Sequence, residues 1–136
     1  MSKQTLNRTP VNPWAWSQKV GYNQGEILEG GSRQLICAGQ TSVDGEGNPM
    51  HTDDMRGQVQ LALENLEAVL VAADMSLANV VKLTIYVTDM DEAMKNFDLL
   101  GMRFGPLGIA PPMTLVGVTR LALPSLMIEI EATAAD

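Results

Sequence analysis

Two glutamates near the C-terminus have the type and the spacing that acid–base chemistry needs. Within the segment Leu126 to Thr133, Glu129 and Glu131 alternate with apolar residues at even positions. Side chains alternate between the two faces of a strand, so both carboxylates should share the face opposite a hydrophobic layer. A carboxylate held at such a surface can take a proton from water and return it to a substrate. Pairing with arginines, or simple exposure to solvent, is the alternative that the sequence leaves open.

A second strand should precede this one. The segment Met113 to Leu121 is rich in β-branched and aliphatic residues, and residues 122–125 form a tight connection that predicts a hairpin. Leu115 faces one way while Val116 and Val118 face the other, so neither face is plainly solvated. We therefore expect another surface to cover this part of the sheet.

The remaining elements must position these strands. Apolar residues at steps of three and four predict a helix from Thr52 or Asp53 to about Ala73 and a second helix from Asp89 to near Gly105. Strict alternation predicts a strand over Asn79 to Thr88, and an earlier hairpin is expected from Glu26–Leu28 and Arg33–Thr41. This order predicts an α+β fold, a mixed sheet with both helices packed on one face. The other face would carry Thr84, Tyr86, Leu115, Gly117, Glu129 and Glu131, and a symmetric oligomer is its simplest cover.

The N-terminal segment shows neither helical nor strand periodicity. Residues 1–18 contain prolines, asparagines and two tryptophans without periodicity, which predicts an irregular arm ahead of a single domain over residues 19–136. Tryptophan is rarely left in a free tail. Trp14 and Trp16 are therefore expected to pack on the domain or on a neighbouring subunit.

Composition restricts the possible partners. The chain has 136 residues, 46% of them hydrophobic, and a formal net charge of −7, which argues against nucleic acid as a partner. No run of about 18 apolar residues and no leader segment is present, so we expect a cytoplasmic protein that does not enter a membrane. One cysteine, Cys37, and one histidine, His51, cannot build a Cys/His metal cluster. No cofactor motif is found, and Cys37 is interpreted as a small buried hydrophobe.

Several short motifs occur in a fixed order along residues 19–134. They are Gly21-Tyr22-x-Gln24, Ala38-Gly39-Gln40, Leu63-x-Asn65-Leu66, Val80-Val81-Lys82, Asn96 with Phe104, and Ile128-Glu129-Ile130-Glu131-Ala132. In this order they resemble the YjgF/Rid family of reactive-intermediate deaminases. The resemblance implies a chorismate-mutase-like fold, a homotrimeric barrel, and clefts between subunits that hydrolyse imines and enamines. It assigns Glu129 to the attacking water and places Tyr22 and Asn96 in the wall of the site.

One position departs from the family pattern. Active members carry an arginine where this chain has Met113, within Pro111-Pro112-Met113-Thr114, and that arginine clamps a substrate carboxylate. Methionine cannot do this. The sequence therefore predicts a hydrolase or deaminase for an imine, enamine or related C–N substrate without the usual carboxylate contact.

The alternative is a non-catalytic family member that binds a small metabolite in a cleft lined by Met113 and Leu115. Arg33, Arg103 and Arg120 are candidates to replace the missing arginine. Endoribonuclease activity is disfavoured by the net charge, and chorismate mutase activity by the scarcity of cationic groups.

Overall fold

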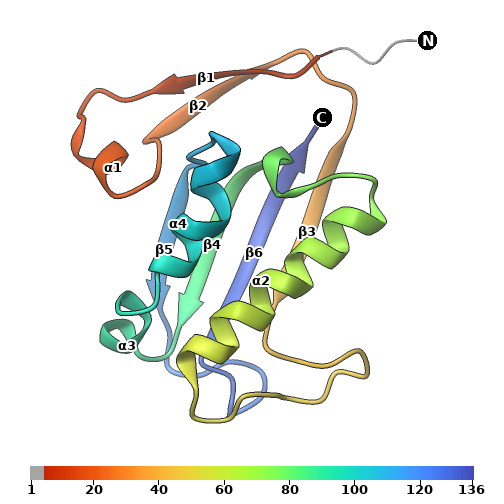
Figure 1. Ribbon diagram of the computed structural model, residues 1–136, viewed down its shortest axis with the longest axis vertical. Helices are drawn as coiled ribbons and strands as arrows, with labels where there is room; N and C mark the ends of the chain where they lie inside the picture. The colour runs from red at the N-terminus through yellow and green to blue at the C-terminus, as the bar shows by residue number, and fades with distance from the viewer. Residues whose placement is uncertain (1–4) are drawn as a thin grey trace.

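The strand predicted over Asn79 to Thr88 is one of the two central strands of the main sheet. The computed structural model describes residues 5–136, and in it β4 (Val80–Val87) buries Leu83, Ile85 and Val87 on one face. β4 pairs antiparallel with β6 (Ile128–Ala135) and parallel with β5 (Met113–Gly117), while β3 (Gln34–Gln40) pairs antiparallel with β6. The strand order is therefore β3-β6-β4-β5 (Figure 1). The predicted mixed sheet is confirmed.

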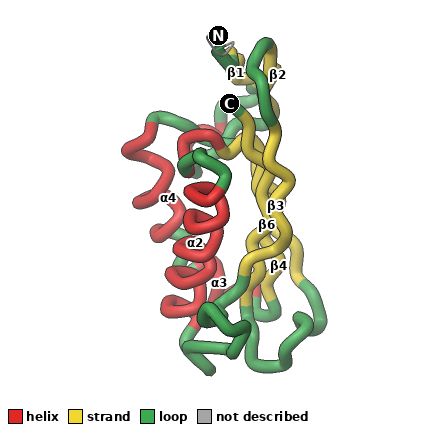
Figure 2. The backbone as a smooth tube through the Cα atoms, turned by 90° about the vertical axis from the view of Figure 1, so that its right-hand side faces the viewer, coloured by secondary structure: helices red, strands yellow, loops and turns green. Residues whose placement is uncertain are grey.

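Helices α2 (Met55–Ala72), α3 (Met90–Met94) and α4 (Asp98–Phe104) lie together on one face of this sheet, as the sequence predicted (Figure 2). The principal helix, α2, is capped by Asp54 rather than by Thr52 or Asp53, because the Asp54 side chain accepts a hydrogen bond from the backbone N–H of Gly57. Its apolar stripe faces the sheet and forms the core with the inner faces of β4 and β6. The fully buried members include Val59, Ala62, Leu63, Leu66, Leu70, Leu83, Ile128 and Ile130.

The second predicted helix is wrong as a single element. It is divided into α3 (Met90–Met94) and α4 (Asp98–Phe104). The Asn96 side-chain amide donates to the Glu92 carbonyl at 2.9 Å, the acceptor that its backbone N–H would use in a continuous helix. The backbone N–H of Asn96 instead bonds Ala93, three residues back. The axis therefore turns here, and the Met94 side chain, at the end of α3, is exposed.

Neither predicted hairpin forms. β5 and β6 are separated by β4, because β5 lies parallel to β4 and places Met113 beside Leu83 and Leu115 beside Ile85. Residues 118–127, which include a turn closed by the bond from Leu126 N–H to the Leu123 carbonyl, carry the chain to β6. At the other end of the chain, β2 (Gly25–Glu29) pairs with a strand that precedes it rather than with β3.

That preceding strand corrects the expectation of an irregular arm. Residues Asn7–Val11 form β1, antiparallel to β2, and the Arg8 guanidinium donates two hydrogen bonds to the Glu26 carboxylate at 2.7 and 2.9 Å. Pro10 is compatible with this two-stranded ribbon because each of its strands has a free edge. The ribbon lies beyond one end of the main sheet, and α1 (Trp16–Lys19) lies in the connection between its two strands (Figure 1).

The two tryptophans are largely exposed in the single chain. Trp14 is 61% exposed and Trp16 is 56% exposed, although the Trp16 ring contacts the Tyr22 ring edge to face. Packing of the exposed ring surfaces on a neighbouring subunit stays a prediction.

The connections also include short 3₁₀ turns at Leu77–Asn79 and Gly105–Leu107. In the part of the chain that the structure describes, no helix is both long and apolar enough to cross a membrane.

Candidate active site

The two glutamates lie on the face of the sheet away from the helices. In the antiparallel register Glu129 is opposite Tyr86 and Glu131 is opposite Thr84, and directly opposed residues share a face. Both carboxylate side chains are half-buried, whereas Ile128 is fully buried on the helix side. The alternation predicted for β6 is thus confirmed. We call the face that carries Glu129, Glu131, Thr84 and Tyr86 the outer face.

Glu131 already has a partner on this face. The Tyr86 hydroxyl donates to Glu131 Oε1 at 2.5 Å, and this bond, together with desolvation and the two neighbouring carboxylates, raises the pKa of Tyr86 above its ordinary value. Lys82, on the same strand and face, donates through Nζ to Thr114 Oγ1 at 2.9 Å. Glu131 therefore acts mainly as a hydrogen-bond acceptor that fixes the tyrosine.

The raised pKa of Tyr86 gives a pH prediction with a definite sign. Only the neutral phenol donates the hydrogen bond, so the stabilisation is complete below the ordinary tyrosine pKa of about 10 and is lost as pH rises through the raised pKa. The chain has two tyrosines, so the Tyr22→Phe variant lets an absorbance titration follow Tyr86 alone. We expect a midpoint above 10 that moves back toward 10 when Glu131→Gln is added. A midpoint at or below 10 in Tyr22→Phe would contradict the structure.

Glu129 has no such partner. Among residues 5–136 no lysine, arginine or hydroxyl group bonds its carboxylate. It lies against Gly39 of β3, where an added Cβ would be 2.6 Å from the Glu129 Cδ atom. A side chain at position 39 would therefore displace the carboxylate. The pairing of β3 with β6 shifts register between Cys37 and Gln40, beside this contact. Glu129 is thus held close to the backbone with its oxygens available to water or a ligand.

Met113 and Leu115 lie on the opposite face from Glu129. Their register with Leu83 and Ile85 places them against the helices, where both pack on the core. The outer face instead carries Thr114 and Val116, so the expectation that Leu115 and Gly117 would be there is wrong. The reason is the parallel pairing of β5 with β4, which fixes the alternation of β5 by that of β4.

A cavity of about 310 Å³ opens beside Met113, between α4, the segment after α1 and the approach to β5. Its wall includes Val20, Phe97, Leu100, Phe104, Ile109 and Met113. The cavity and Glu129 are on opposite faces of one sheet, and β4 separates β5 from β6. A single chain therefore does not bring Met113 and Glu129 into one site.

Tyr22 and Asn96 have structural contacts of their own. The Tyr22 ring meets the Trp16 ring edge to face, with centroids 6.0 Å apart. Asn96 is buried, and its amide is held by Glu92 and by Arg56, whose Nη1 atom lies 3.4 Å from Asn96 Oδ1. Neither residue is in the cavity wall, but their neighbours Gly21 and Phe97 are.

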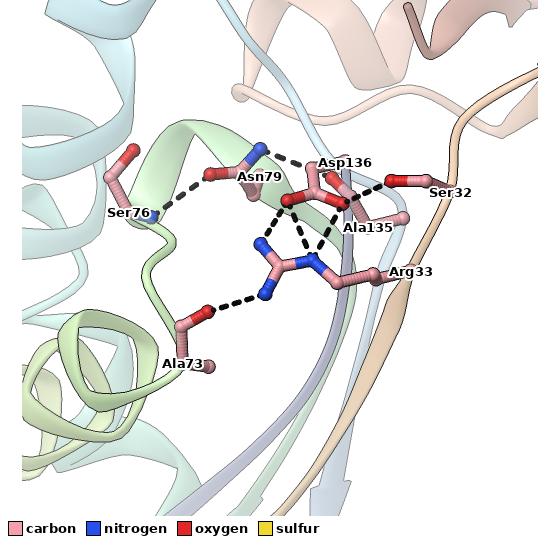
Figure 3. A network of polar contacts seen from close by, with 7 residues as sticks. All are labelled: Ser32, Arg33, Ala73, Ser76, Asn79, Ala135 and Asp136. Carbon is pink, nitrogen blue, oxygen red and sulfur yellow. Dashed lines mark hydrogen bonds and ion pairs between the residues drawn. The ribbon is translucent and has the colours of Figure 1, made fainter. Parts of the chain in front are cut away.

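The candidate replacement arginines are engaged elsewhere. Arg33 bonds the carboxylate of Asp136 and the Ala73 carbonyl, in a network that ties the C-terminal residue to the end of α2 (Figure 3). Arg103 pairs with Glu67 at 2.8 Å. Arg120 donates to the backbone carbonyls of residues 121 and 122. No charged residue of the described chain lines the cavity beside Met113.

Metal binding finds no support in the geometry. Within residues 5–136 no group of three or more histidine, cysteine or acidic side chains could hold a metal ion. Cys37 is buried, and burial raises the pKa of its thiol, which agrees with its interpretation as a small hydrophobe.

Strict alternation predicts that Lys82 shares a face with Thr84 and Tyr86, and in the structure Lys82 lies on the outer face near Glu131. Sequence reasoning missed the cavity beside Met113, because Val20 and Ile109 reach it from irregular segments far apart in the sequence.

Known proteins resemble this chain in sequence and in fold. Residues 15–136 match the family described as Endoribonuclease L-PSP. A RutC family protein of Pyrococcus horikoshii is 32% identical over 125 residues, which cover 92% of this chain and 88% of that protein. The crystal structure of a Rid family protein of unknown function from Yersinia pestis superimposes with a TM-score of 0.82 at 33% identity, covering 96% of this chain and 99% of the other.

A third relative carries a functional name. The Escherichia coli protein TdcF, provisionally named a reactive intermediate deaminase, is 32% identical over 82 residues, which cover 60% of this chain and 63% of that protein. The chain described here belongs to the YjgF/Rid family.

Proposed function

We propose that this chain is a Rid-type hydrolase that releases ammonia from a small imine or enamine, in a site completed by a second copy of the chain. The observation that carries the proposal is Glu129, a half-buried carboxylate without an ion-pair partner in the described residues, held against Gly39 on the outer face. The name of TdcF supports the same reaction class. No metal or organic cofactor is needed for this chemistry, and a cytoplasmic metabolite is the expected substrate.

The reaction requires one carboxylate, that of Glu129, to transfer protons between water and the substrate. Glu129 would accept a proton from water while the water oxygen attacks the imine carbon, and the C=N bond becomes a C–N single bond. Return of this proton to nitrogen gives the carbinolamine R₂C(OH)NH₂. Glu129 would then take the hydroxyl proton and pass it to the nitrogen, so that C=O forms as the C–N bond breaks, and R₂C=NH and H₂O become R₂C=O and NH₃. An enamine enters the same sequence after protonation at carbon.

The site needs more than one chain. The outer face carries Ile36, which is 74% exposed, and the half-buried Val116, and β5 leaves one strand edge unpaired in the described residues. Apolar side chains and a free edge of this kind favour contact with another chain. We propose a homotrimer in which outer faces turn inward, so that Glu129 of one copy approaches the β5 edge and the cavity of the next. Light scattering should give three times the chain mass of 14.7 kDa.

A second candidate is a non-catalytic protein that binds a small metabolite in the same interfacial cleft. The observation that favours it is Met113, together with the absence of a charged side chain from the described wall of the cavity. Without a carboxylate clamp, a substrate could be bound but poorly oriented for attack.

Ammonia release separates the two candidates. The purified oligomer is mixed with imines generated in place, one set carrying a carboxylate and one uncharged, and ammonia is followed against the spontaneous rate. We expect acceleration with the uncharged set. A folded oligomer that accelerates neither set would support the binding protein instead.

A further inference from the structure

The cavity beside Met113 is lined by uncharged, apolar side chains. The side chains in its wall are aliphatic, aromatic or thioether groups from three separate segments: residues 20–21, residues 97–105 and residues 109–113. Its volume of about 310 Å³ is at the lower end of the range for small-molecule sites, roughly 300–1,000 Å³. Such a wall favours an apolar group and disfavours a carboxylate, which would lose its hydration without gaining a partner.

Glycines keep the cavity open. Gly21, Gly101 and Gly105 all border it, and a Cβ atom added at any of them would meet nothing within 4 Å. At Gly101, inside α4, alanine would favour the helix by about 1 kcal/mol relative to glycine. The glycine is thus unfavourable for the helix and leaves the space beside it free.

We infer that the cavity binds an uncharged apolar group, branched aliphatic or aromatic, and that it selects C–N substrates by that group in place of a carboxylate. The assignment of this group to a substrate rests on the proposed function. The binding preference itself does not, because Glu129 lies on the other face of the sheet of the same chain.

Two ligands of equal shape and different charge test the preference. The full-length oligomer is titrated with 4-methylpentanamide and with 4-methylpentanoate at pH 7.5, and each dissociation constant is measured by calorimetry or by NMR. We expect the amide to bind at least about 10-fold more tightly, because the carboxylate would be desolvated without a counter-charge. Equal or tighter binding of the carboxylate would overturn the inference.

Variants then locate the bound ligand. Gly101→Leu should fill part of the cavity and weaken amide binding at least about 10-fold, whereas Gly101→Ala adds a single carbon and should retain it within about 3-fold. Both changes favour the helix, so a folded protein is expected in each case. Unchanged amide affinity in Gly101→Leu would show that the ligand binds elsewhere and that the inference is wrong.

A charge introduced at position 113 should reverse the preference. Met113→Arg places a guanidinium in the cavity wall, and we expect 4-methylpentanoate to bind at least about 10-fold more tightly than it binds the native chain. Met113→Leu, which keeps the wall apolar, should leave the native preference intact. These binding results stand whether or not ammonia release is found, so failure of the proposed function is distinguished from failure of this inference.

Discussion

Glutamine in place of Glu129 should lower the rate of ammonia release at least about 100-fold, the usual contribution of a positioned general acid–base group. The change keeps the size of the side chain and removes only its ability to take a proton. Glu129 forms no ion pair in the described chain, so the fold should not depend on its charge. The thermal midpoint and the oligomer mass should therefore be unchanged.

Glu131→Gln is the matched control, because it lies on the same strand and face two residues away. A glutamine oxygen can still accept the hydrogen bond from Tyr86, so we expect this variant to keep more than about a tenth of the native rate. Measuring steady-state ammonia release by both variants decides which glutamate is the general acid–base group. If Glu131→Gln loses activity while Glu129→Gln retains it, the catalytic role belongs to the other carboxylate.

Methionine in place of Gln58 should lower the free energy of unfolding by roughly 3 kcal/mol, the cost of leaving three backbone groups without the partner that a buried side chain supplies. Gln58 is fully buried in α2. Its Nε2 atom donates to the carbonyls of His51 and Ser125 at 3.1 and 3.0 Å, and its Oε1 atom accepts from the Met127 N–H at 2.7 Å. Methionine fills the same space but satisfies none of these three backbone groups.

Gln60→Met gives the comparison for this change, because Gln60 is exposed on the same helix two residues later. Urea denaturation should show a change within about 0.5 kcal/mol for this surface variant. A similarly small change for Gln58→Met would mean that water or a local shift replaces the three lost bonds. Met127 stands two residues before Glu129, so Gln58→Met should also reduce ammonia release in the folded protein.

The sequence was sufficient where a pattern depends on one element alone. The stripe of α2 predicted its buried residues, since a helix that lies on a sheet must present one apolar face. The alternation of β6 placed Glu129 and Glu131 on one face of the strand and Ile128 and Ile130 on the other, because successive side chains of a strand point to opposite faces. Short motifs in a fixed order were sufficient for the family.

The sequence failed where elements far apart in the chain compete for one partner. Local turn residues suggested that β5 would pair with β6, but β4 pairs with both and lies between them. That choice reversed the face expected for Leu115, because a strand takes its alternation from the neighbour with which it bonds. The broken second helix likewise follows from one side-chain bond of Asn96 that no periodicity reports.

The sequence by itself determined the family, the apolar layers and the pair of carboxylates on one strand face, because each follows from residue type and local period. Only the tertiary structure decided that Met113 and Glu129 face opposite sides of the sheet and that an uncharged cavity lies beside Met113. Strand order and cavity shape come from contacts between segments distant in the chain, and residue spacing carries no record of those contacts.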